Sequence, residues 1–132
     1  MIDPNVAPGG FTKEDRVVKM GAFRRVYSRG FHASSAAFGC YVLPRRDNRF
    51  RLGLSVSRKY GNSPARNRIK RLLREAFRRV RHGLPGGADV IMVPRRAAAS
   101  LDWPEIGREM DALVRRALRD RRRRKREGKR KR

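Results

Sequence analysis

The sequence predicts a single small domain in which helices and strands are mixed along the chain. A chain of 132 residues is long enough for one hydrophobic core and short for two. In three segments apolar residues recur at intervals of three and four, as on one face of a helix. The runs between these segments favour extended structure or alternate apolar with polar residues, as strands do.

The first helix is expected to begin at Thr12, a candidate N-cap, and to end before Gly30. Asp15 follows three residues after Thr12, close to the spacing of a capping box. The apolar stripe of this helix consists of Val17, Met20, Phe23, Val26 and Tyr27. Residues 1–11 contain prolines and glycines, so they are expected to form a flexible segment ahead of a folded domain at 12–119.

Two extended stretches are expected next, separated by a polar turn after Pro44. The first covers residues 31–44, where aromatic and β-branched residues favour a strand. In the second stretch, Phe50, Leu52, Leu54 and Val56 alternate with Arg51, Gly53, Ser55 and Ser57. This period of two buries one face and leaves the other open. Because the open face is small and polar between bulkier neighbours, it predicts a groove.

A second helix is expected from Ser63, a candidate N-cap, through Pro64 in its first turn to about His82. On a helical wheel its apolar residues share one side: Ile69, Leu72, Leu73, Ala76, Phe77 and Val80. The opposite side carries Asn67, Lys70, Arg71, Arg74 and Arg78, with Arg66 and Arg68 at the borders. One side therefore predicts packing on a sheet, and the other predicts a row of positive charge.

This positive row has two interpretations. A helix face that is merely solvated usually mixes acidic and basic residues. Here Glu75 is the single acid of the helix, and arginine dominates. Because a guanidinium makes two planar hydrogen bonds to a phosphate, the composition favours binding of a polyanion over a role in solubility alone.

The last third of the chain predicts one more strand and one more helix. Residues 89–93 form a short apolar run that ends at Pro94. Asp102 is a candidate N-cap for the last helix, with Glu105 at the capping-box spacing. Residues 120–132 form an almost wholly basic tail, which is expected to be disordered when free even if the helix extends into it. The tail either adds non-specific attraction for polyanions or is dispensable.

The charge balance indicates a nucleic-acid partner. Lys and Arg total 36 against 12 Asp and Glu, a net charge of +24. Self-repulsion on this scale opposes a compact state unless a polyanion neutralises it. An anionic membrane surface is the weaker alternative, since no amphipathic anchor stands apart from the core pattern. The start of the chain does not resemble a signal peptide, no apolar run is long enough to span a membrane, and the single cysteine fits a reducing cytosol.

The sequence offers no catalytic machinery of its own. Two histidines lie far apart, one cysteine is present, and no acidic pair has a useful spacing. Any reaction is therefore expected to draw its reactive groups from a partner. Phe23 and Tyr27 lie four residues apart, which fits a core position or a groove where aromatic rings stack on unpaired bases.

One stretch carries a family resemblance. Residues 51–78 contain Ser57-Arg58-Lys59 after a strand, then Gly61 in a loop, then Arg66-Asn67-Arg68 in a helix. This stretch resembles the signature of the bacterial ribonuclease P protein subunit, and Lys70, Arg71, Arg74 and Phe77 continue it. A looser likeness extends over about residues 14–118. Pro64 departs from the small or polar residue that members often have before the Arg-Asn-Arg run, which puts only the local loop shape in question.

The resemblance implies a fold and a function. The fold is a single α+β domain of order α-β-β-β-α-β-α, with a four-stranded sheet, a first strand near 31–34 and a left-handed βαβ crossover, as in domain 2 of ribosomal protein S5. The protein would join a catalytic RNA, which with Mg²⁺ bound mainly by the RNA cleaves the 5′ leader from precursor tRNA. No obligate protein partner, no metal site of the protein and a cytoplasmic location are expected.

The resemblance also implies two sets of site residues. The contacts to the catalytic RNA would be Arg58, Lys59, Arg66, Asn67, Arg68, Lys70, Arg71 and Arg74. The cleft for the single-stranded leader would be lined by Phe23, Tyr27, Tyr41, Arg51, Ser55 and Ser57. Three alternatives remain: a ribosomal protein, which shares the composition, a DNA-compacting protein, and a protein-only nuclease, which the missing catalytic groups disfavour.

Overall fold

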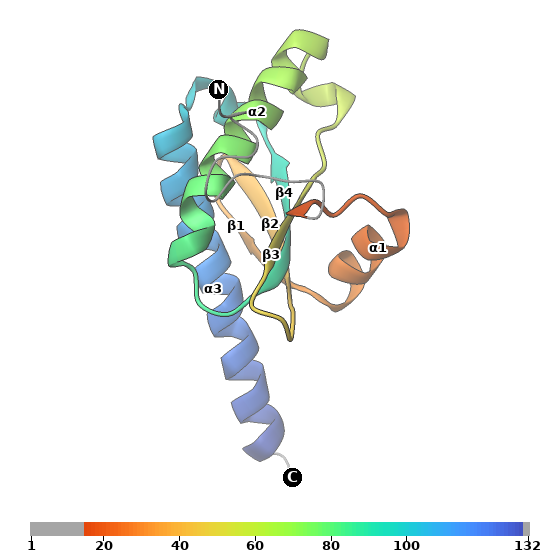
Figure 1. Cartoon of the computed structure of the whole chain (residues 1–132), viewed down its shortest axis with the longest axis vertical. Helices are drawn as coiled ribbons and strands as arrows, with labels where there is room; N and C mark the ends of the chain where they lie inside the picture. The colour runs from red at the N-terminus through yellow and green to blue at the C-terminus, as the bar shows by residue number, and fades with distance from the viewer. Residues whose placement is uncertain (1–14, 131–132) are drawn as a thin grey trace, which may run out of the picture.

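The computed structural model describes the backbone of residues 15–130 and the side chains of residues 15–120. Its elements are α1 (Met20–Arg29), β1 (Phe31–Ser34), β2 (Phe38–Pro44), β3 (Phe50–Leu54), α2 (Ser63–Val80), β4 (Ala88–Pro94) and α3 (Trp103–Arg130) (Figure 1). Short 3₁₀ helices follow β3 (η2, Arg58–Tyr60), α2 (η3, Arg81–Gly83) and β4 (η4, Arg96–Ser100). The predicted element order and the single α+β domain are confirmed.

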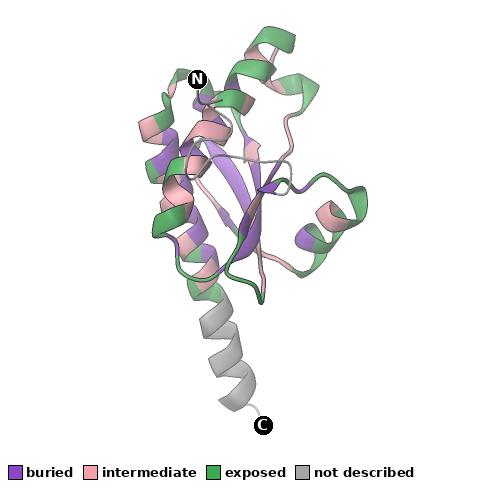
Figure 2. Cartoon of the chain, in the orientation of Figure 1, coloured by how far each residue is buried: buried purple, intermediate pink, exposed green. Residues whose placement is uncertain are grey.

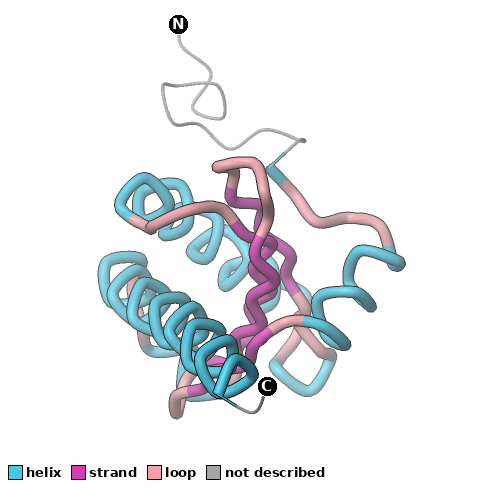
Figure 3. Tube along the Cα trace, turned by 90° about the horizontal axis from the view of Figure 1, so that it is seen from below, coloured by secondary structure: helices cyan, strands magenta, loops and turns pink. Residues whose placement is uncertain are grey.

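The four strands form one mixed sheet in the order β1-β2-β4-β3. β2 pairs antiparallel with both β1 and β4, whereas β3 pairs parallel with β4. Parallel neighbours need a crossover, and α2 provides it between β3 and β4. α2 and α3 lie on one face of the sheet, and α1 lies on the other (Figures 1 and 3).

The core fills the space between the sheet and the helix pair. Alternate residues of the central strands point into it, among them Cys40 and Val42 from β2 and Val90 and Met92 from β4. The predicted apolar side of α2 meets them, with Ile69, Leu73, Ala76 and Phe77 buried. Figure 2 shows the buried residues along the sheet and on the helix sides that face it. The second helix is thus anchored by one side only, and its other side stays exposed to solvent.

The start of the chain differs from the prediction. α1 begins at Met20, and residues 16 and 17 run beside the outer edge of β3 instead. The Val17 amide donates to the Leu52 carbonyl over 3.0 Å, and the Val17 side chain is buried. The reason is that β3 is an edge strand with unpaired backbone groups, and a β-branched residue suits extended pairing there. The predicted N-cap at Thr12 and the N-terminal segment 1–11 lie outside the described residues.

Ionic contacts tie this segment to the domain. Asp15, which is almost completely buried, lies 3.1 Å from Arg81 and 3.6 Å from Arg49. Met20, which the sequence placed on the apolar stripe of the helix, is exposed at the first position of α1. Within α1 only Val26 is buried, so this helix is attached to the sheet by few side chains.

The helix caps are partly as predicted. Asn62, not Ser63, caps α2: its Oδ1 accepts from the Ala65 amide over 3.0 Å. Asn62 has the extended backbone that a cap requires, whereas Ser63 is already helical. Pro64 occupies the first turn, as predicted. At α3, Asp102 and Glu105 form the predicted capping box, with amide-to-carboxylate distances of 3.1 and 3.4 Å.

The backbone of α3 continues through the basic tail as far as Arg130 and projects past the rest of the domain (Figure 1). No helix in the part of the chain that the structure describes combines the length and the apolar character needed to cross a membrane.

Candidate nucleic-acid interface

The exposed side of α2, together with η2, forms a surface that we call the basic face. It consists of Arg58, Lys59, Arg66, Asn67, Arg68, Lys70, Arg71 and Arg74. These are the residues that the resemblance assigned to RNA contacts, and the structure places Arg58 and Lys59 on η2 and the other six on the first three turns of α2, where Arg66, Lys70 and Arg74 are partly buried. The packing of Ile69 and Leu73 against the sheet sets which side of the helix they occupy.

The cations of the basic face have no acidic partner among residues 15–120. The carboxylates in this range bind elsewhere: Asp15 to Arg81 and Arg49, Asp47 to Arg45, and Asp111 to Arg115. Even Glu75 on the same helix binds Arg78 and Arg79, one turn beyond the basic face, and these two cations lower the pKa of Glu75. The positive charge along the first three turns of α2 is therefore uncompensated.

Two arginines of the Arg-Asn-Arg run are held in place by the protein. Arg66 donates to the Ser63 hydroxyl over 3.0 Å, and its buried Nε has no hydrogen-bond partner. Arg68 donates to the Ala99 carbonyl of η4 over 3.4 Å. Arg71 is exposed and contacts no carboxylate of the described chain. Arg66 and Arg68 thus help to position the start of α2, and Arg71 is open to a ligand.

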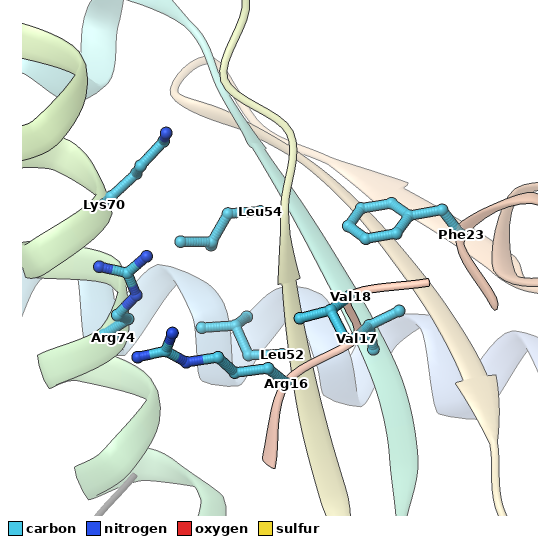
Figure 4. Close-up of a pocket in the computed structure, with 8 residues that line it drawn as sticks. All are labelled: Arg16, Val17, Val18, Phe23, Leu52, Leu54, Lys70 and Arg74. Atoms are coloured by element: carbon cyan, nitrogen blue, oxygen red, sulfur yellow. The ribbon is translucent and has the colours of Figure 1, made fainter. Parts of the chain in front are cut away.

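A pocket of about 180 Å³ lies at the edge of β3 (Figure 4). Its walls are Arg16, Val17, Val18, Phe23, Leu52, Leu54, Lys70 and Arg74. Lys70 and Arg74 point into it from α2, and Phe23 approaches from the far side of β3 (Figure 4). Partial burial and the nearby positive charge of Arg16 lower the pKa of Arg74. Cations gathered over an apolar floor favour an anionic group there.

The second predicted set of residues lies on the opposite face of the sheet, under α1. Here the strand register places His32, Tyr41, Ile91 and Gly53 in one line across all four strands. Phe23 of α1 lies over Gly53, where an added Cβ would be 2.9 Å from its Cζ. Tyr27 of α1 lies over Tyr41, with ring centroids 4.7 Å apart in an edge-to-face arrangement.

These aromatic groups form what we call the ring row: Phe23, Tyr27, Tyr41 and His32. Consecutive centroids are separated by 6.4, 4.7 and 4.6 Å. Tyr27 and His32 are exposed, whereas Phe23 and Tyr41 are half-buried. The structure therefore brings together the three aromatic residues predicted for the cleft and adds His32. No local pattern points to His32, because its contact with Tyr41 depends on strand pairing.

The three remaining residues of the predicted cleft lie in different surroundings. Arg51 is held by Asp89 through two hydrogen bonds of 2.7 Å each. Ser55 extends the β3 ladder by one bond to the Met92 carbonyl and is half-buried. Ser57 is exposed where η2 begins. The buried carboxylate of Asp89 also binds Arg45, over 3.2 Å. Arg45 binds Asp47 as well, and this contact lowers the pKa of Asp47 to about 2. Arg51 thus ties β3 to β4 at this end of the sheet.

Most acidic side chains of the described residues are engaged by cations or by hydroxyl and amide groups rather than grouped as metal ligands. Residues 15–120 contain no group of three histidine, cysteine, aspartate or glutamate side chains arranged to hold a metal ion. The ionic neighbours of Asp89 and Asp15 are guanidinium groups, which repel a cation.

Comparison with known proteins decides between the alternatives. The sequence model of the family described as Ribonuclease P matches residues 11–118. The chain belongs to the ribonuclease P protein component family. The ribonuclease P protein component of Halalkalibacterium halodurans is 38% identical over 95 residues, covering 71% of this chain and 80% of that protein. The ribonuclease P protein component of Shouchella clausii is 37% identical over 106 residues, covering 80% of this chain and 87% of that protein.

Solved structures of ribonuclease P proteins have the same fold. A mutant of the Staphylococcus aureus protein, with defective mRNA degradation activity, superposes with a TM-score of 0.71 at 32% identity, covering 80% of this chain and 90% of that one. The protein of Thermotoga maritima superposes with a TM-score of 0.68 at 27% identity, covering 76% of this chain and 96% of that one. The resemblance inferred from residues 51–78 is thereby confirmed over most of the domain, and the ribosomal and DNA-compacting alternatives are disfavoured.

Proposed function

We propose that this chain is the protein subunit of a ribonuclease P that removes the 5′ leader from precursor tRNA. The observation that carries the proposal is the basic face, whose cations have no acidic partner among the described residues although the sheet side of the same helix is fully packed. An uncompensated row of arginines on a rigid helix is suited to phosphates held at a fixed spacing. Family membership identifies the partner as the RNA subunit of ribonuclease P.

In this proposal the basic face binds the catalytic RNA. Arg58, Lys59 and Arg71 supply open cations, while Arg66 and Arg68 order the first turn of α2 from which they project. Neutralising phosphates where RNA strands approach one another lowers the salt and Mg²⁺ that the assembly needs. The contact is to backbone rather than to bases, so it recognises RNA shape rather than its sequence.

The ring row binds the single-stranded leader. Unpaired bases stack on aromatic faces, and the row offers rings from α1 and from β2 on one side of the sheet. Since mature tRNA lacks the leader, this contact distinguishes the substrate from the product. Phe23 belongs to both the ring row and the pocket with Lys70 and Arg74, so the two RNA surfaces meet at the edge of β3.

Catalysis is assigned to the RNA subunit, which would also hold the Mg²⁺ ions. The protein contributes binding and orientation, and no step of the cleavage passes through its own side chains. The other partner is precursor tRNA, no obligate protein partner is required, and the site of action is the bacterial cytoplasm, where precursor tRNA is made.

Reconstitution tests this function. The purified chain is combined with a bacterial ribonuclease P RNA and precursor tRNA at low Mg²⁺, and leader removal is scored. Cleavage at the mature 5′ end that requires both components is the expected result. No stimulation, together with equally tight binding to unrelated duplexes, would leave only a generic basic nucleic-acid binder.

The leader contact is tested separately by the double variant Phe23→Ala/Tyr27→Ala. Affinity of the reconstituted enzyme for precursor tRNA should fall while its affinity for mature tRNA stays unchanged. Equal losses for both ligands would contradict the assignment of the ring row to the leader.

A further inference from the structure

The ring row does not stop at the aromatic residues of α1 and β2. It continues to His32 on β1, the edge strand on the opposite side of the sheet from β3. The imidazole lies 4.6 Å from the Tyr41 ring, at an interplanar angle of 42°. His32 is exposed, so its outer face is open to a ligand. The row thus ends in a ring that carries nitrogen donors.

Arg95 reaches the same part of the sheet. Gly39 pairs with Ser34, two residues along the strands from the pair of His32 with Tyr41. A Cβ added to the buried Gly39 would lie 3.7 Å from Cβ of Val93, 3.9 Å from Nε2 of His32 and 4.0 Å from Nη2 of Arg95, which are ordinary contact distances. Arg95 is held by its Nη1, which donates to the Ser35 carbonyl over 2.9 Å. The nitrogen groups of His32 and Arg95 therefore lie near each other over Gly39.

We propose that His32 is a further leader-binding residue, at which one more leader nucleotide stacks on the imidazole and places its phosphate between His32 and Arg95. This inference rests on the proposed leader contact of the ring row. It extends the path of the single strand beyond Tyr41 to the far edge of the sheet. It also assigns recognition of a phosphate to two side chains that carry nitrogen donors.

The charged groups near His32 favour an anion. Those brought to this end of the sheet are Arg95 after β4, and Arg116 and Glu109 of α3. Arg116 donates to the Ser34 carbonyl, and Glu109 accepts from the Ser35 hydroxyl over 2.7 Å. From β2 and α1 the neighbours are the uncharged rings of Tyr41 and Tyr27. Two of these three charged groups are basic and the acid is engaged by Ser35, so the local charge favours a phosphate.

Mature tRNA lacks the leader and does not reach His32, so its affinity should not depend on this residue.

The experiment measures the affinity of the reconstituted enzyme for precursor and mature tRNA, under conditions that block cleavage. The variants are His32→Ala and His32→Phe. For His32→Ala, which removes the ring and its nitrogen donors, we expect precursor affinity to fall by about fivefold or more, with mature tRNA unaffected. For His32→Phe, which keeps a ring but loses the nitrogen donors, we expect a smaller loss of precursor affinity. Because His32 is exposed, both variants should unfold at the same temperature as the parent.

Each outcome bears on one claim. Wild-type precursor affinity in His32→Ala would overturn the proposal. Wild-type precursor affinity in His32→Phe would overturn the phosphate contact. If precursor affinity falls in Phe23→Ala/Tyr27→Ala but not in His32→Ala, the leader site ends at Tyr41. If precursor affinity is unchanged in both Phe23→Ala/Tyr27→Ala and His32→Ala, the proposed leader contact itself is wrong.

Discussion

The α-carbon of Gly53 lies directly beneath the ring of Phe23: a methyl group added to Gly53 would be 2.9 Å from Cζ of Phe23 and 3.2 Å from Cβ of Val17. Gly53 belongs to β3, Phe23 to α1, and Val17 to the segment that pairs with the edge of β3. The absence of a side chain on one strand residue thus sets how closely α1 approaches the sheet, and it places the first ring of the ring row.

Replacing Gly53 by alanine should displace the Phe23 ring and weaken leader binding. Overpacking at such a contact lowers the free energy of unfolding by about 1–3 kcal/mol. Affinity for precursor tRNA should fall, and that for mature tRNA should not. The matched control is Gly21→Ala in α1, where an added Cβ meets no atom within 4 Å. That variant should gain about 0.5–1 kcal/mol of stability and keep its affinity. Unchanged precursor binding in Gly53→Ala would contradict the placement of the Phe23 ring.

Removing one open cation from the basic face should change the salt dependence of RNA binding. Arg71 is exposed and has no acidic partner in the described chain. Arg71→Ala should therefore reduce the slope of log affinity against log salt by about one, with similar losses for unrelated RNA sequences. Arg46→Ala removes the same charge from the exposed turn before β3, at the other end of the sheet, and should leave the slope unchanged. Equal slopes for the two variants would show that only total charge matters.

Asp89 should contribute strongly to stability. Its carboxylate is 4% exposed and lies between Arg51 at 2.7 Å and Arg45 at 3.2 Å. Asp89→Ala removes the carboxylate partner of Arg51 and leaves Arg45 with Asp47 alone. Because these two guanidinium groups are about one-quarter exposed, the expected loss is about 2–3 kcal/mol rather than the full effect of a buried pair. Chemical denaturation measures it. Asp111→Ala, which breaks a surface pair with Arg115, should cost less than about 0.5 kcal/mol.

Cys40 should be chemically inert in the folded protein. Burial raises the pKa of its thiol to about 12, and the thiolate is the reactive form. A thiol reagent at about pH 8 should modify Cys40 only after unfolding. Between the pKa of an unfolded thiol, about 8.5, and about 12, the unfolded chain releases this proton and the folded chain retains it. The free energy of unfolding should therefore fall as the pH rises through this range. Rapid modification under native conditions would show that β2 opens easily.

The sequence alone was sufficient where the signal is local. The two sides of α2 follow from a repeat of three and four residues, and the capping box of α3 from Asp102 and Glu105. Prediction from the sequence failed for residues 15–18, where pairing with the open edge of β3 outweighed the helical spacing of Val17 and Met20. The partner of Val17 on that edge is Leu52, 35 residues further along the chain, so no local pattern reveals the pairing.

The candidate site shows the same division between local and distant information. Basic residues within α2 could be assigned from the helix itself. The partner of Arg51 could not, because Asp89 reaches it only through the parallel pairing of β3 with β4. Similarly, His32 joins the ring row only because β1 pairs with β2 in a register that sets it opposite Tyr41.

α1 has one fully buried side chain, Val26, and its other contacts with the sheet come from the half-buried Phe23 and the exposed Tyr27, which has a consequence for the dynamics of this helix. A helix with so little buried apolar surface opens locally at a small fraction of the cost of global unfolding, and its amides exchange hydrogen early. The sheet beneath it, with Ile91 and Val90 fully buried, stays closed. One wall of the proposed leader site is thus expected to be compliant and the other rigid. A small movement of α1 should then accommodate a purine or a pyrimidine, so precursors with different leader sequences are expected to bind the same site.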